Sequence, residues 1–115
     1  MQRDPRKYLW DALRAAERLS RFTQGKSFAD YQADDLLKSA VERQFEIIGE
    51  ALNQLSKVSP ELAEQMPEIP RIVAFRNILI HGYAMVDDVP VWQVLTDKRP
   101  VLDQAIRKLL ADLSD

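Results

Sequence analysis

Apolar residues along this chain recur every three to four positions, the spacing of one face of an α-helix. A first such stretch follows Asp4, a residue type that caps helices, and Pro5, which suits a first helical turn. Its apolar face consists of Leu9, Ala12, Leu13, Ala16 and Leu19. Gly25 lies just beyond this face, so we predict a first helix that ends shortly before it.

A second, longer helix is predicted from about Ala33 to Lys57. At 100° per residue its apolar positions fall within a narrow arc, which neighbouring apolar residues then widen. The narrow arc contains Leu37, Val41, Ile48, Leu52 and Leu55, and the wider one adds Leu36, Ala40, Ile47 and Ala51. We expect this helix to be the most buried element of the protein.

Two shorter helices follow. Ser59, a capping residue type placed before a proline, opens a helix that runs to about Gln65. The next is predicted from about Pro70 to Ile80. Gly82 stands where a glycine that ends a helix is usually found.

The remaining residues form a final helical stretch. Asp87 or Asp88 caps it, and Pro90 lies in its first turn. Pro100 either kinks this stretch or splits it in two. Strand signals are weak throughout, so we predict an all-α, up-and-down bundle of four to five helices, forming one domain over residues 1–115.

Composition narrows the chemistry. The 115 residues contain no cysteine and one histidine, so disulfides, thiolate catalysis, cysteine-bound zinc and a multi-histidine metal site within one chain are excluded. The net charge of −2 does not suggest a strong general nucleic-acid binder. No segment has the apolar length of a membrane span or a secretion signal. We therefore expect a cytoplasmic protein with no membrane association and no bound metal or cofactor.

One distinctive segment spans residues 76–83 and contains the single histidine, His81, at the end of a predicted helix. The partial negative charge of a helix C-terminus favours protonated imidazole, which can act as a general acid, with the neutral form as a base. Asn77 shares its face and could orient the ring, and Arg76 suits a phosphate. These groups fit cleavage of an RNA phosphodiester through the ribose 2′-hydroxyl, although a histidine at a helix end also serves as a simple hydrogen-bonding group.

Geometry limits this pairing. In a continuous helix, Arg76 and His81 are five residues apart and lie about 140° apart around the axis. They converge only if the helix ends at His81 or if a second copy of the chain contributes. A symmetric dimer would bring two such segments together.

The spacing of Arg76, His81 and Tyr83 matches the R-x4-H-x-Y form of the HEPN superfamily motif, and the chain resembles its HepT-like toxins. Three flanking segments resemble that family in the same order, namely residues 45–51, 67–70 and 91–92. Relatives commonly carry tryptophan where this chain has Arg71, a difference that lies outside the motif.

This resemblance implies a homodimeric, metal-independent endoribonuclease acting on RNA, either tRNA or mRNA, as the toxin of a toxin–antitoxin pair. Arg76 and His81 are then the catalytic pair. Tyr83 is the residue to which a cognate MntA-type nucleotidyltransferase antitoxin transfers AMP, which neutralises the toxin. The nucleotide and magnesium of that reaction belong to the partner.

Two polar stripes are further candidates. The second helix carries one that supports the site or is only its solvated face, with local ion pairs. Its members are Arg43, Glu46, Glu50 and Asn53. The first helix carries a basic stripe, diluted by Asp11, that tracks an RNA backbone or is simply solvated. Its members are Lys7, Arg14, Arg18 and Arg21.

Two other functions remain open at this point. The chain could be a non-catalytic HEPN subunit that docks a nucleotidyltransferase, or a helical interaction module without a nucleic-acid role. A neighbouring nucleotidyltransferase gene would favour the toxin or the non-catalytic HEPN subunit over the interaction module.

Overall fold

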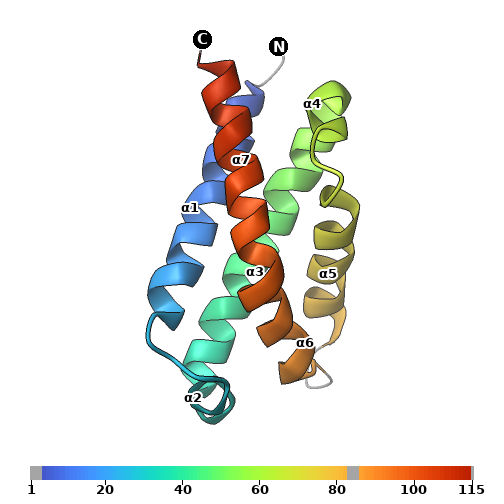
Figure 1. The fold of residues 1–115 in the computed structure, drawn as a ribbon. Coiled ribbons are helices and arrows are strands. Elements are labelled where there is room, and N and C mark those ends of the chain that lie inside the picture. The colour runs from blue at the N-terminus through green and yellow to red at the C-terminus, as the bar shows by residue number, and fades with distance from the viewer. Residues whose placement is uncertain (1–3, 83–85, 115) are drawn as a thin grey trace.

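The regular elements of the computed structural model are all helical over the residues that it describes, 4–82 and 86–114. In chain order these are α1 (Pro5–Thr23), α2 (Phe28–Ala33), α3 (Asp35–Val58), α4 (Pro60–Glu64), α5 (Ile69–Gly82), α6 (Asp88–Gln93), the π-helical segment η2 (Val94–Lys98) and α7 (Arg99–Leu113). Figure 1 shows the long helices running up and down beside one another. The predicted all-α fold is confirmed, and none of these helices is long and apolar enough to cross a bilayer.

The centre of the bundle is the packing of α1 against α3. All five residues of the predicted apolar face of α1 are buried, as are the five of the narrow arc of α3. Fully burying a leucine stabilises a fold by about 1.5–3 kcal/mol, so this pair of helices supplies much of the core. Leu36 does not belong to it: 81% of its surface is exposed, because it lies in the first turn of α3 at one end of the bundle.

The helix α2 was not predicted from the apolar pattern, because it is too short to show a period. Its signal is a capping box: the Asp30 amide donates to Ser27 Oγ at 3.1 Å, and the Ser27 amide donates to the Asp30 carboxylate at 2.9 Å. Phe28 and Tyr31 then pack against the Trp92 ring of α6, with ring centroids 6.0 and 5.4 Å apart. This contact ties the start of α3 to the start of the last helical stretch.

Pro100 does not split the last stretch. The proline ring excludes the carbonyl four residues earlier, and the wider π turn of η2 accommodates that exclusion. In this turn the Arg99 amide donates to the carbonyl of Val94, five residues back. The Leu95 carbonyl, which an α-helix would pair with that amide, accepts from Arg99 Nε at 3.3 Å instead. Helical backbone therefore continues from α6 through η2 into α7.

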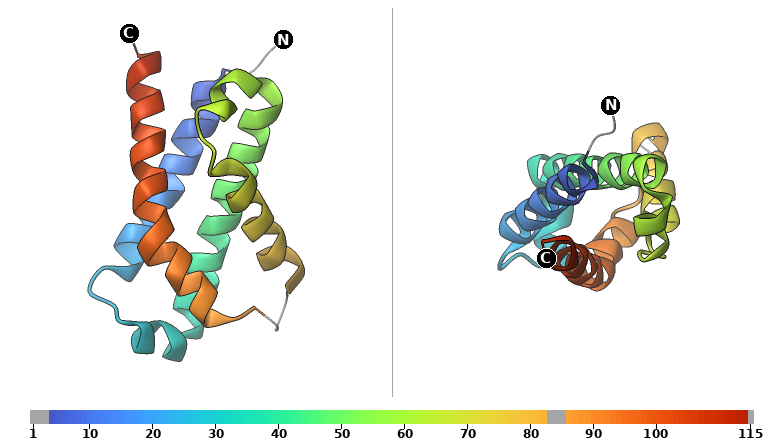
Figure 2. Two further views of the ribbon diagram at one scale, coloured as in Figure 1. Left: turned by 45° about the vertical axis from the view of Figure 1, so that its right-hand side comes forward. Right: turned by 90° about the horizontal axis from the view of Figure 1, so that it is seen from above.

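Helices α5 and α7 attach to the bundle separately. The former packs mainly on α3 and the latter mainly on α1. Viewed from above, the two helices lie on the same side of the α1–α3 pair (Figure 2). The motif helix α5 is therefore positioned chiefly by its contact with α3.

Helices α3 and α5 approach each other closely at Gly49. A Cβ atom on Gly49 would lie 2.4 Å from Arg76 Cβ and 2.7 Å from Arg76 Cγ. The arginine stem thus occupies the space that any other residue at position 49 would need. Close by, the rings of Phe45 and Phe75 meet edge to face, with centroids 5.2 Å apart.

Two predicted helix ends differ in detail from the structure. Ser59 occupies the position before α4, but its side chain makes no capping hydrogen bond. Gly82 was expected where a helix ends, and α5 does end there, two residues later than the predicted Ile80 and without the positive φ that, among the described glycines, only Gly25 has, at 73°. A Cβ on Gly82 would lie 2.7 Å from Val86 Cγ2, so the glycine allows a close approach of the chain after α5.

Gly49→Ala tests the close approach of α3 and α5. Glycine to alanine inside a helix normally stabilises by roughly 0.5–1 kcal/mol. Here we expect a loss of about 1–3 kcal/mol, because the added methyl group collides with the Arg76 stem. Urea unfolding followed by circular dichroism measures the change, and Ser39→Ala at an exposed position of α3 is the control. A stabilised Gly49→Ala protein would contradict the close approach.

Candidate active site

Arg76 lies on the side of α5 that faces α3, and its guanidinium is largely buried. Its Nη1 lies 2.6 Å from Glu50 Oε2, and 17% of the arginine side chain is exposed, against 52% of the glutamate. The Nε atom is buried without a hydrogen-bond partner among the described residues. The guanidinium is therefore only partly accessible to a substrate.

Glu50 is constrained from two sides. One of its oxygens accepts from Arg76, and the other accepts from Gln54 Nε2 at 3.0 Å. Gln54 is one turn further along α3, so the amide and the carboxylate share a face. A charge-assisted pair anchored in this way fixes the position of the guanidinium.

His81 lies in the last turn of α5 and is exposed. Since α5 is continuous from Ile69 to Gly82, His81 and Arg76 remain about 140° apart around the helix axis. One chain does not bring the two side chains together. Asn77 is exposed and makes no hydrogen bond to His81 in the described part of the chain, while Tyr83 lies outside the described residues.

The second predicted supporting carboxylate, Glu46, does not contact Arg76. It pairs with Arg43 at 3.5 Å, on the same helix. One turn earlier, burial raises the pKa of Glu42, and the nearby carboxylates of Glu46 and Asp88 raise it further. Of the two predicted glutamates, only Glu50 therefore reaches the motif arginine.

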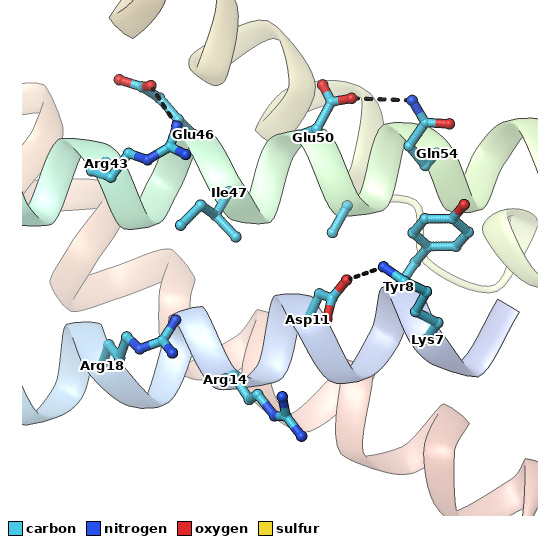
Figure 3. Close-up of a pocket in the computed structure, with 11 residues that line it drawn as sticks. Lys7, Tyr8, Asp11, Arg14, Arg18, Arg43, Glu46, Ile47, Glu50 and Gln54 are labelled. Carbon is cyan, nitrogen blue, oxygen red and sulfur yellow. Dashed lines mark hydrogen bonds and ion pairs between the residues drawn. The ribbon is translucent and has the colours of Figure 1, made fainter.

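The polar stripes of α1 and α3 come together to form a groove of about 340 Å³. It is lined by Lys7, Tyr8, Asp11, Arg14, Arg18, Arg43, Glu46, Ile47, Glu50, Ala51 and Gln54. Figure 3 shows these side chains along the two helices, with Arg18 extending from α1 toward α3. Arg21 and Asn53 do not line it, although the sequence grouped them with these stripes.

Sequence reasoning missed two parts of this region. Gln54 gave no signal, because glutamine on an exposed helix face is common. A second groove of about 370 Å³ lies between α5 and the η2–α7 segment, lined partly by Phe75, Val101 and Leu102, with Glu68 at its edge. Helical periodicity could not indicate it, because it depends on how α5, η2 and α7 are placed relative to one another in the bundle.

Comparison with known protein families assigns this helical bundle to a family. A family model described as "Ribonuclease HepT-like" matches residues 12–109, a range that includes Arg76 and His81. The chain belongs to this family. This confirms the HepT-like resemblance drawn from the sequence.

Several curated proteins are similar over nearly the whole chain. A protein of Thermococcus cleftensis named as a probable ribonuclease HepT is 36% identical over 112 residues, covering 95% of this chain and 98% of the relative. A protein of Caldanaerobacter subterraneus subsp. tengcongensis, named as a candidate RNase, is 34% identical over 108 residues, covering 92% and 94%. A Methanocaldococcus jannaschii protein with the same kind of name is 29% identical over 116 residues, covering 99% and 97%. No solved structure matches the chain significantly.

A double-mutant cycle tests the Glu50–Arg76 pair. Alanine at either position, and at both, should give a coupling free energy of about 1 kcal/mol, because the arginine is largely buried while water still screens the half-exposed glutamate. The same cycle on Arg43 and Glu46 is the matched control. That exposed pair should give about 0.5 kcal/mol or less. Equal couplings in urea unfolding would show that Arg76 is not specially anchored.

Proposed function

We propose that this protein is the toxin of a toxin–antitoxin pair and acts as a metal-independent endoribonuclease. The observation that carries the proposal is the family match, which spans the segment containing Arg76 and His81. The ribonuclease names of the relatives support it. The anchored, partly accessible guanidinium and the exposed imidazole are the two groups that the chemistry requires.

In the proposed reaction, a ribose 2′-oxygen attacks the adjacent phosphorus, and the bond to the 5′-oxygen of the next nucleotide breaks. An imidazole of His81 accepts the 2′-hydroxyl proton, and an imidazole in its protonated form supplies a proton to the leaving oxygen. Arg76 stabilises the negative charge that develops on the non-bridging oxygens. The products carry a 2′,3′-cyclic phosphate and a 5′-hydroxyl, and the cyclic phosphate can later open by hydrolysis.

We infer that the active form is a homodimer. Because α5 continues past His81, the histidine and arginine of one chain diverge, and a second copy is the remaining way to bring them together. Ile78 is 60% exposed and lies about 60° from His81 around the axis of α5, so an apolar side chain is available beside the histidine for contact with a second copy.

We also propose that a cognate MntA-type nucleotidyltransferase neutralises the toxin by transferring AMP to Tyr83. The phenol oxygen would attack the α-phosphorus of ATP and release pyrophosphate. Tyr83 is two residues from His81 in the sequence. The added nucleotide would place bulk and negative charge beside a site that binds RNA phosphate.

Arg76→Ala and His81→Ala should each reduce RNA cleavage to background in the presence of a chelator, with unchanged helical content. Gel analysis of a labelled RNA measures the loss, and end-group analysis should show cyclic phosphate in the wild-type products. Arg71→Ala, an exposed arginine earlier on α5, should retain activity and is the control. Full RNA cleavage by His81→Ala would contradict the assignment of His81 as a catalytic residue. Absence of cleavage by the wild-type protein would favour a non-catalytic subunit that docks the nucleotidyltransferase.

Mixing these two inactive variants then tests the shared site. If Arg76 of one copy works with His81 of the other, mixed dimers regain one intact site each. Random exchange makes half of the dimers mixed, so activity should return to about a quarter of the wild-type level. No recovery, despite subunit exchange shown by native mass spectrometry, would contradict a site built from both copies.

Tyr83→Phe should keep ribonuclease activity and resist neutralisation by the nucleotidyltransferase with ATP and magnesium, because it lacks the attacking oxygen. Mass spectrometry of the treated wild-type protein should show added AMP on the peptide containing Tyr83. Tyr31→Phe, at a buried tyrosine, is the control and should be neutralised normally. A neutralised wild-type complex with unmodified Tyr83 would point instead to occlusion of the active site.

A further inference from the structure

The groove between α1 and α3 has an excess of positive charge that its own ion pairs do not use. We propose that this groove binds the backbone of a single-stranded RNA segment next to the cleavage site, with Arg14 and Arg18 as the principal phosphate contacts. The inference rests on the proposed function, because it describes where the substrate of that reaction lies.

The pairing of charges around the groove singles out these two arginines. Lys7 pairs with Asp11 at 2.9 Å, and the carboxylates of Glu46 and Glu50 are used by Arg43 and Arg76. Arg14 and Arg18 have no ion pair or hydrogen bond from their side chains within the described part of the chain. They are therefore two guanidinium groups available to an anion.

The positions of the two arginines suit a linear polyanion rather than a small one. They are four residues apart, so they lie one above the other on the same face of α1. Two guanidinium groups one helical turn apart can contact successive phosphates of a strand, each through its planar fork of donors. Both arginines line the groove. In Figure 3, Arg18 extends toward α3, whereas Arg14 points away from α3 on the outer side of α1.

The groove adjoins the proposed active site through one shared residue, Glu50. Glu50 lines the groove on one side and binds Arg76 on the other. From Lys7 to Arg18 the α1 wall is about 16 Å long, enough for a few nucleotides of single strand. The Tyr8 and Ile47 side chains add apolar surface to the lining. A strand in the groove would thus reach Glu50, the residue that pairs with the guanidinium assigned to the scissile phosphate.

The experiment measures binding without cleavage. A fluorescent, single-stranded RNA of about twelve nucleotides with 2′-O-methyl groups cannot be cut by 2′-hydroxyl attack, so fluorescence anisotropy reports its affinity for the wild-type protein. Arg14→Gln/Arg18→Gln should weaken binding roughly 10–25-fold at about 0.1 M salt. The slope of log affinity against log salt should fall by about 1.4, for two lost phosphate contacts.

Two further variants separate local contact from net charge and from folding. Lys98→Gln/Lys108→Gln removes the same charge from exposed positions of η2 and α7 that do not line the groove, and it should change affinity less than about threefold. Arg14→Lys/Arg18→Lys keeps the charges and should restore most of the affinity. Circular dichroism should show the same helical content in all of these proteins.

Equal weakening by the two glutamine variants would overturn the proposal, because net charge alone would then explain the effect. An unchanged salt slope in Arg14→Gln/Arg18→Gln, or no RNA binding by the wild-type protein, would also overturn it. These failures differ from failure of the proposed function, which shows as cleavage that persists without His81 or Arg76. If the protein binds RNA through the groove but cuts no RNA, the groove proposal would be supported and the proposed ribonuclease activity would be contradicted.

Discussion

The close approach of α3 and α5 at Gly49 is the contact on which the candidate site depends. The Arg76 stem lies where a side chain at position 49 would otherwise be, which brings its guanidinium within 2.6 Å of Glu50. Because α5 packs mainly on α3, this crossing determines where the motif helix sits in the bundle. A larger residue at position 49 would therefore move the arginine and the whole helix together.

The same helix places the two motif residues in contrasting surroundings. Arg76 is buried, paired and fixed, whereas His81 is exposed at the far end of α5. A fixed cation can stabilise developing charge without reorganising, which is the favourable arrangement for electrostatic catalysis. An exposed imidazole can meet groups supplied by another molecule. The two residues also lie on different sides of α5, and for that reason we proposed a site that draws on two copies of the chain.

Glu50 connects the motif helix to the groove on the other side of α3. Its carboxylate partly neutralises Arg76. Earlier on α3, Arg43 and Glu46 form an ion pair with each other, so their charges offset one another. On α1, Asp11 does the same for Lys7. The charge left over in this region is therefore local and positive, even though the net charge of the chain is −2. In the proposal above, this local pairing, and not the net charge of the chain, is what leaves positive charge available to an anionic strand.

The sequence by itself determined the helices and most of the core, because burial on one face of a helix imposes a period that can be read directly. The apolar period wrongly placed Leu36 in the core, because it does not show that this residue lies at the end of the bundle. It also did not predict α2, because a helix of under two turns is too short to show a period. The sequence also indicated Arg76 and His81 through their spacing and family resemblance. Only the tertiary structure decided that Glu50, and not Glu46, pairs with Arg76, and that stripes on α1 and α3 form one groove. Both facts depend on how helices that are distant in sequence cross. The crossing of α3 and α5 depends on the absence of a side chain at Gly49, and the sequence alone does not show that α5 packs at this position.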